Sequence, residues 1–241
     1  MHLDWERLAD GVYRCRLAFC DVTVGLVCGR PGALLVDSGT TLVETAAIEA
    51  DVREITDCAV THIVLTHKHF DHVLGSGRFR DAELYCAPEV ADYLASATDH
   101  LRRHALSYGA DAVQIDRAIA ALRRPQHAVS DAVIDLGDRA VTVAHPGRGH
   151  TGSDLVVAVP AVRSGDPVVL FTGDLVEESA DPYIDDDSDL RAWPATLDRL
   201  LRHPQPGVHV GQRADVGVLV DLHTREHQRG IGTGDRRGNS G

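Results

Sequence analysis

The sequence lacks several features that would place it in a particular class of protein. No stretch approaches the roughly 20 consecutive apolar residues of a membrane-spanning helix, and no basic segment followed by an apolar run opens the chain. Basic residues are few, with 24 Lys and Arg against 36 Asp and Glu, so the net charge is −12. Such a charge disfavours nucleic acid and anionic membranes as partners. We therefore expect a cytoplasmic protein that acts on a small-molecule substrate.

Cysteine is scarce and irregularly spaced. The five cysteines are odd in number and include no CxxC pair, which fits reduced thiols better than a disulfide framework. They are Cys15, Cys20, Cys28, Cys58 and Cys86. We expect them to pack as small buried apolar residues.

Apolar residues are plentiful, at 44% of 241, which is enough for one α/β domain with a substantial core. Short β-branched or apolar segments, separated by Gly, Pro and Asp, predict strands at residues 12–19, 22–29 and 32–39. After Thr41 the pattern becomes helical. The residues predicted to share one helix face are Val43, Ala46, Ala47 and Ala50. With the apolar strand around Ile63, these elements predict a strand–helix–strand unit.

A long segment at about 87–130 has a helical pattern and reads as an insertion between sheet elements. Leu94, Ala97 and Leu101 keep one face, and a later helical stretch closes at Pro125. A long insertion in a compact fold commonly forms a lid or a specificity element, so we expect this one to cover or border a pocket.

The second half returns to strands. These are predicted at residues 132–136, 140–145, 154–160 and 167–173. A last amphipathic helix is predicted to group Trp193, Leu197, Leu200 and Leu201 on one side. Residues 224–241 are polar and Gly-rich and are predicted to be a disordered tail, which leaves 1–223 as the domain.

The stretch "HIVLTHKHFDH" at 62–72 is the most informative in the chain. An apolar strand runs directly into a segment that places three imidazoles and a carboxylate within six positions, those of His67, His69, Asp71 and His72. Residues two apart in an extended segment point the same way, so these side chains can converge. Burying imidazoles and a carboxylate this close together costs several kcal/mol unless they have partners, and a bound cation would offset that cost.

Two later strands deliver the same kind of residue at their ends. "VTVAHPGRGHTGSDLVV" presents His150 in a Gly-rich turn, and "PVVLFTGDLV" presents Asp174. Three strand ends therefore have metal-type ligands. A carboxylate beside two cations can bridge them, and metals so bridged can lower the pKa of a shared water to about 7.

These motifs, together with an early "LLVDSG", occur in the order that is the signature of the metallo-β-lactamase fold superfamily, which the chain resembles from about Val12 to Leu201. The resemblance implies a four-layer αβ/βα sandwich with a dinuclear site, usually zinc, at one edge of its two sheets. It implies that Asp37 orients ligands through hydrogen bonds. The implied metal ligands are His67, His69 and His150 on the first ion, Asp71 and His72 on the second, and Asp174 between them.

The resemblance also implies an activity. The leading hypothesis is a zinc-dependent hydrolase in which hydroxide, oriented by Asp71, attacks an ester, thioester or amide-like carbonyl. True β-lactamases of the class have Cys where Asp174 stands and Arg where His72 stands, so this chain is closer to the broader hydrolase and glyoxalase-type branch. The alternatives are an iron-dependent persulfide dioxygenase and a metal-binding member that is not catalytic. Phosphodiester hydrolysis of nucleic acid is disfavoured by the charge.

One motif of the family is altered. Where a "PGHG" turn normally supplies a last histidine for the second metal, this chain reads "HPQPGVHVGQRADV". If residues 208–210 form the strand, Gln212 falls in the ligand's place, with His209, His223 or His227 as substitutes. An amide oxygen is a weaker zinc ligand than imidazole, so we expect the second metal to bind loosely.

The other polar residues are weaker candidates for a functional role. Asp185, Asp186 and Asp187 are predicted to form a solvated loop, with a place on the substrate rim as the alternative. His145 and Arg148 flank the site in sequence and are weaker candidates for substrate contact. The histidines predicted to lie on the surface or at caps are His2, His62, His100, His104, His127 and His203.

Overall fold

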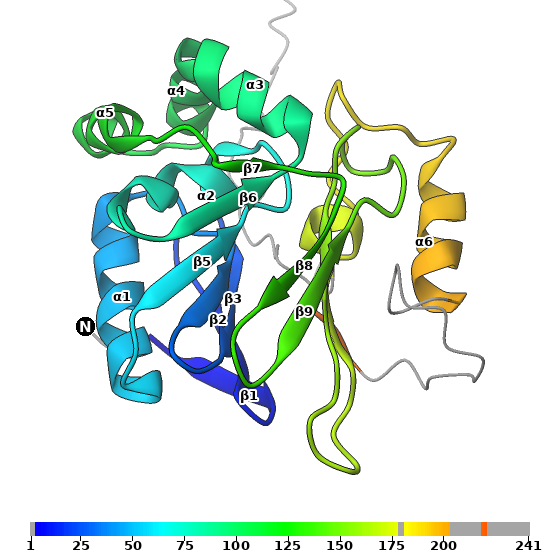
Figure 1. The fold of residues 1–241 in the computed structure, drawn as a ribbon. Coiled ribbons are helices and arrows are strands. Elements are labelled where there is room, and N and C mark those ends of the chain that lie inside the picture. Colours follow the sequence, from blue (N-terminus) through cyan, green and yellow to red (C-terminus); the bar gives the residue numbers. More distant parts are fainter. Residues whose placement is uncertain (1–2, 178–180, 203–217, 221–241) are drawn as a thin grey trace, which may run out of the picture.

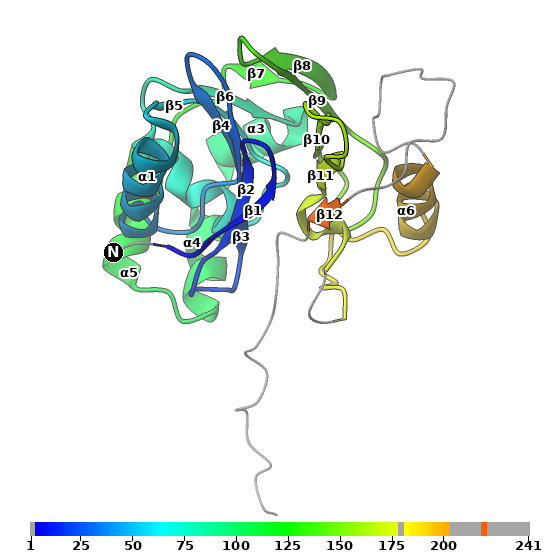
Figure 2. The ribbon, with the colours of Figure 1, turned by 90° about the horizontal axis from the view of Figure 1, so that it is seen from below.

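Two β-sheets packed face to face between helices form four layers. The structure, a computed structural model, describes residues 3–177, 181–202 and 218–220. Helix α1 (Leu42–Thr56) lies on the outer side of the first sheet and α6 (Trp193–Arg202) on the outer side of the second (Figure 1; Figure 2). This arrangement confirms the predicted four-layer α/β sandwich.

The first sheet follows the order of the chain. Its seven strands are β1 (Trp5–Ala9), β2 (Val12–Arg16), β3 (Thr23–Cys28), β4 (Ala33–Val36), β5 (Val60–Val64), β6 (Glu83–Cys86) and β7 (His127–Ala128). Strands β1 to β4 pair antiparallel, whereas β4 to β7 pair in parallel. The three strands predicted in the first third are confirmed as β2, β3 and β4, and β4, α1 and β5 form the predicted strand–helix–strand unit.

The second sheet has five strands in the order β12, β11, β10, β9, β8. They are β8 (Asp131–Asp135), β9 (Ala140–Ala144), β10 (Val156–Val159), β11 (Val169–Phe171) and β12 (Val218–Val220). Strands β8 to β11 pair antiparallel, and β12 pairs in parallel with β11. The four strands predicted at 132–173 are confirmed. The strand predicted at 208–210 and the tail predicted at 224–241 lie outside the described residues.

The helix predicted after Thr41 is confirmed as α1, but the face that Val43, Ala46, Ala47 and Ala50 share is not its buried face. Val43 is 62% exposed. The buried side chains are Thr45, Ile48, Asp51 and Val52. Asp51 can be buried because its carboxylate accepts hydrogen bonds from the backbone N–H of Leu3 and the indole of Trp5. The alanine pattern missed this face because alanine is tolerated on the surface, while two of the buried residues are polar.

The segment at 87–130 contains three helices, α3 (Pro88–Ser96), α4 (Thr98–Ser107) and α5 (Ala112–Ala121). They lie over one end of the first sheet, near the short helix α2 (Phe70–Val73) (Figure 1). Leu94 and Leu101 are buried, as their spacing predicted, and Ala97 separates α3 from α4. The end of α4 is therefore close to the residues that follow β5.

All five cysteines are thiols, and Cys15 and Cys86 are buried. Burial raises the pKa of each of these two to about 12, so they stay protonated at neutral pH. Among the described residues, no helix combines the length and the apolar character needed to cross a bilayer.

Gly25 of β3 and Phe171 of β11 form a close contact between the two sheets. A Cβ atom on Gly25 would lie 2.5 Å from a carbon of the Phe171 ring. Phe171 is fully buried and belongs to the core formed by the inner faces of both sheets. The ring occupies the space that the missing side chain leaves, which sets the local separation of the sheets.

We predict that Gly25→Ala lowers the free energy of unfolding by about 1–3 kcal/mol, because the fully buried ring has to move. Urea denaturation measures this. Gly152→Ala is the matched control, since a Cβ there meets only the flexible side chain of Arg148, at 3.8 Å. Adding Phe171→Leu to Gly25→Ala should recover part of the loss. Equal stability of the two glycine variants would contradict this account of the sheet contact.

Candidate metal centre

Polar side chains from both sheets meet at one edge of the sandwich. The residues after β5 place His67 and His69 in a loop and Asp71 and His72 on the first turns of α2. The second sheet supplies His150 from the connection between β9 and β10, and Asp174 from the 3₁₀-helix η2 (Gly173–Leu175) after β11. All six are buried. The structure thus brings together the six side chains that the resemblance implied as ligands of the two ions.

The first group consists of His67, His69, His150 and Asp174. One ligand atom from each lies within 4.8 Å of the others. His69 Nδ1 is 3.0 Å from His150 Nε2. Asp174 Oδ2 is 3.7 Å from His67 Nε2 and 3.5 Å from His150 Nε2. Three imidazoles and a carboxylate so placed are able to hold a metal ion, and the donor set suits zinc.

The second group lies on the other side of Asp174. Its Oδ1 atom is 3.4 Å from His72 Nε2, and Asp71 Oδ2 is 3.8 Å from the same nitrogen. The two oxygens of Asp174 therefore face different imidazoles, Oδ2 those of His67 and His150 and Oδ1 that of His72. This is the arrangement expected of a carboxylate shared between two cations.

Asp37 orients two of these imidazoles through their Nδ1 atoms, directly for His72 and through Thr66 for His67. His72 Nδ1 is 2.8 Å from Asp37 Oδ2, to which the Thr66 hydroxyl also donates at 2.7 Å. The oxygen of that hydroxyl is 3.0 Å from His67 Nδ1, so it can accept the imidazole N–H. With Nδ1 of both rings directed at these oxygens, each Nε2 is directed toward Asp174. An outer acceptor that fixes the tautomer in this way is typical of metal-bound histidine.

The backbone at Asp37 is unusual. Its φ is 60°, in the left-handed region that costs a residue with a side chain about 1–3 kcal/mol. The carboxylate is fully buried, and it accepts a further hydrogen bond from the Thr66 backbone N–H at 2.8 Å. Three hydrogen bonds thus offset the strain and fix the end of β4 against the end of β5.

The loop around His150 is fixed from two sides. The N–H and hydroxyl of Thr151 donate to the carboxylate of Asp154 at 2.9 and 2.7 Å. His150 Nδ1 is 3.2 Å from the Tyr183 carbonyl, and the Ser188 hydroxyl donates to the His150 carbonyl at 2.8 Å. His150 Nε2 is thereby left to face the first group.

Burial sets the charge state of the imidazoles. Burial lowers the pKa of His67 well below its ordinary value and that of His150 to about 4, so both are neutral at pH 7. Neutral imidazole is the form that binds metal. His67 Nε2 is buried and has no hydrogen-bond partner among the described residues. Burial also acts to lower the pKa of His72, but the carboxylates of Asp174, Asp37 and Asp71 outweigh it and hold that pKa well above the ordinary value.

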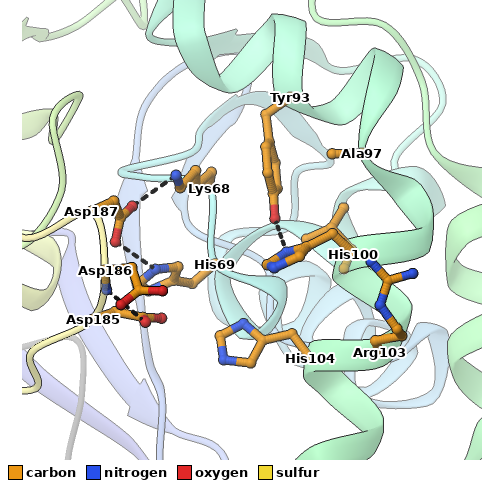
Figure 3. A pocket seen from close by; sticks show the side chains of 11 residues that line it. Lys68, His69, Tyr93, Ala97, His100, Arg103, His104, Asp185, Asp186 and Asp187 are labelled. Atoms are coloured by element: carbon orange, nitrogen blue, oxygen red, sulfur yellow. Dashed lines mark hydrogen bonds and ion pairs between the residues drawn. The ribbon is translucent and has the colours of Figure 1, made fainter.

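A cavity of about 620 Å³ opens beside His69 (Figure 3). Its wall includes residues of α3 and α4 and the loop after η2. The lining residues are Lys68, His69, Tyr93, Ala97, His100, Leu101, Arg103, His104, Asp185, Asp186 and Asp187. The prediction that the inserted helices border a pocket is confirmed.

One histidine of this wall was misjudged from the sequence. His100 and His104 were both predicted to be surface or capping residues, and both line the cavity. His100 is exposed, as predicted, whereas His104 is half-buried and its ring lies 6.0 Å from that of His69. Their spacing of four residues within a predicted helix was the available signal, because it puts both on one face. Asp185, Asp186 and Asp187 line the same cavity, and their contact with a substrate stays a prediction.

The weaker candidates take different places. His145 Nδ1 is 2.7 Å from the Asp154 carbonyl, which gives His145 a part in the loop that presents His150. Arg148 forms an ion pair with Asp189 at 3.3 Å and lines a neighbouring cavity of about 700 Å³. Gln212, His209, His223 and His227 lie outside the described residues, so the completion of the second group stays a prediction.

Comparisons with known proteins agree with this geometry. A family model described as the metallo-beta-lactamase superfamily matches residues 17–216. The structure is similar to a metallo-beta-lactamase from Pontibacter korlensis, with a TM-score of 0.65 and 20% identity over 93% of this chain and 92% of that chain. It is also similar to a metallo-beta-lactamase from Erythrobacter litoralis, crystallised with beta-mercaptoethanol in the active site. There the TM-score is 0.63 and the identity 18%, over 92% of this chain and 90% of that chain. At these identities the likeness of the structures shows the fold alone.

The hydroxyl of Thr66 should matter for metal affinity. We predict that Thr66→Val weakens zinc binding by about 10–100-fold, because His67 loses the acceptor that fixes its tautomer. Thr45→Val is the matched control: it removes another buried hydroxyl, which donates to the Thr41 carbonyl within α1 at 2.7 Å. Competition with a chromophoric chelator measures both affinities. Equal zinc affinities in the two variants would exclude this role for Thr66.

Proposed function

The chain belongs to the metallo-beta-lactamase superfamily, and on that premise we propose that it is a zinc-dependent hydrolase of an ester, thioester or amide-like bond in a small-molecule substrate. The observation that supports this most is the position of Asp174. Its Oδ2 is 3.5 Å from His150 Nε2, while its Oδ1 is 3.4 Å from His72 Nε2. A carboxylate with buried imidazoles facing each of its two oxygens suits a pair of cations better than a structural ion pair.

The residues have distinct parts in this proposal. Zinc held by His67, His69 and His150, with a second ion at Asp71, His72 and Asp174, would supply a water of lowered pKa and polarise a substrate carbonyl. Asp71 is 4% exposed and lies on the first turn of α2, beside the cluster. Its carboxylate can accept a proton from water and so orient the attack on the carbonyl carbon.

Access to the cluster is narrow. A small cavity of about 10 Å³ lies against His69, Asp71 and Asp174, and this volume suits a single water. Its other lining residues are Phe70, His104, Tyr108 and Tyr183. The Tyr108 hydroxyl donates to that of Tyr183 at 2.9 Å, which joins the end of α4 to the loop after η2. A substrate carbonyl needs more room than one water, so this contact has to open. We propose that the substrate enters from the 620 Å³ cavity, which shares His69 and His104 with the small one.

Metal content and hydrolysis test the proposal directly. Protein prepared in zinc-containing medium should hold between about one and two zinc ions per chain by elemental analysis. His69→Ala and Asp71→Asn should each lower the hydrolysis of activated esters or thioesters by at least ~100-fold, through lost metal and lost orientation of water. His127→Ala is the control, because His127 stacks on Tyr85 and bonds Glu83 at the surface.

Each other outcome has its own meaning. Iron in place of zinc would favour the persulfide dioxygenase. Bound zinc without hydrolysis of any ester, thioester or lactam would favour a metal-binding member that is not catalytic. Protein that holds no metal, or unchanged turnover in both site variants, would contradict the proposal.

The Tyr108–Tyr183 contact can be tested without a known substrate. Tyr108→Phe and Tyr183→Phe each remove the hydrogen bond and keep the ring. A bond of about 1 kcal/mol predicts that a chelator extracts the metal about fivefold faster. The double variant should be no faster than either single one, because the same bond is lost. Tyr85→Phe is the matched control, because it removes a tyrosine hydroxyl that donates to Glu83, away from the cluster. If a chelator extracts the metal from Tyr108→Phe and Tyr183→Phe no faster than from Tyr85→Phe, the proposal that this contact limits access to the cluster is contradicted.

A further inference from the structure

His69 differs from the other imidazoles in the way it faces the cluster. His67, His72 and His150 each turn Nε2 inward, and their Nδ1 atoms meet Thr66, Asp37 and the Tyr183 carbonyl respectively. His69 turns Nδ1 inward instead, 3.0 Å from His150 Nε2. Its Nε2 therefore points outward, toward the 620 Å³ cavity. The residue that faces this nitrogen is Asp187, whose Oδ1 lies 3.9 Å away (Figure 3).

Asp187 is itself firmly held. Its Oδ2 is 2.8 Å from Lys68 Nζ, and the two side chains are only 24% and 27% exposed. The ammonium of Lys68 also lies 5.1 Å from the centre of the Tyr93 ring. Burial raises the pKa of Asp187, but the contacts with His69 and Lys68 outweigh it and hold that pKa below the ordinary value. Asp187 is thus a carboxylate anion, with Lys68 on one oxygen and His69 facing the other.

The neighbouring aspartates, Asp185 and Asp186, are less suited than Asp187 to interact with His69 Nε2. Asp185 also has an oxygen within 4.8 Å of His69. Its Oδ1, however, already accepts the Asp186 backbone N–H at 2.8 Å, and its Oδ2 lies 3.5 Å from the Tyr183 hydroxyl. Asp186 is exposed. A separate cation between His69, Asp185 and Asp187 is disfavoured, because the Lys68 ammonium already occupies Asp187.

We propose that Asp187 is a positioning residue for His69: in the metal-bound site its carboxylate closes the 3.9 Å separation, accepts the Nε2–H and so keeps the Nδ1 lone pair directed at the metal. This inference rests on the proposed metal-dependent function. It completes a pattern in which each of the four imidazoles has one outer acceptor. The same loop holds His150, through the Tyr183 carbonyl and the Ser188 hydroxyl, so one short segment orients two ligands of the first ion.

The test compares Asp187→Asn with Asp186→Asn, which makes the same change one residue earlier in the loop. Zinc affinity is measured by competition with a chromophoric chelator. We expect Asp187→Asn to weaken binding by about 10–100-fold and Asp186→Asn to leave it nearly unchanged. Asp187→Glu should restore part of the affinity. In cobalt-substituted protein, the visible absorption bands should change for Asp187→Asn and not for its neighbour.

A double variant separates the effect of the His69 orientation on zinc affinity from the effect of the Lys68 charge. Asp187→Asn leaves the Lys68 ammonium without its carboxylate, and a bare cation near the site would by itself repel zinc. The double variant Lys68→Met with Asp187→Asn removes that cation. We expect its zinc affinity to stay low, because His69 still lacks its acceptor, whereas recovery to the wild-type value would overturn the positioning role.

The remaining outcomes keep the two proposals apart. Wild-type protein that binds no zinc would overturn both the proposed function and this inference. Zinc binding with the same affinity in the Asp186→Asn and Asp187→Asn variants would overturn the inference alone. Melting temperatures of the metal-free variants should match that of the wild type, which shows that a weaker affinity does not arise from misfolding.

Discussion

The buried carboxylate of Asp37 is the constraint on which the site depends. A lone charge in such a place would cost several kcal/mol, yet here it accepts hydrogen bonds from the Thr66 backbone, the Thr66 hydroxyl and His72. These bonds connect the end of β4, the end of β5 and the helix α2. Because Thr66 also meets His67, one carboxylate determines the orientation of two imidazoles. The left-handed backbone at Asp37 is the conformational cost of this connection.

Charge balance follows from the same burial. The imidazoles of His67 and His150 are neutral at pH 7, so among these ligands the negative charges of Asp71 and Asp174 have little to balance them except His72. Acidic groups and uncharged nitrogens held together away from water are favourable only when a cation joins them. The acidic balance of the whole chain, at −12, acts in the same direction.

The sequence predicted the cluster well because its determinants are local. Each ligand lies in the segment that follows an apolar strand, and strand ends of neighbouring elements meet at one edge. The face of α1 was predicted wrongly because Asp51 is buried through bonds to Leu3 and Trp5, which no periodicity reveals. His104 and Asp187 were missed for a related reason. Both reach His69 only because α4 and the loop after η2 fold over the site, and an acidic run or a helical histidine by itself is usually solvated.

The cluster draws its ligands from both halves of the sandwich, His67 and His69 from the first sheet and His150 and Asp174 from the second. An ion bound to all four would therefore act as a clamp between the halves, and its binding free energy would add to the free energy that keeps them associated. Inside the core, apolar side chains of both sheets pack together without any ion, and Phe171 is one of them. Loss of the metal would then weaken the association of the two halves at this edge first. The free energy of unfolding would therefore rise with the concentration of free metal.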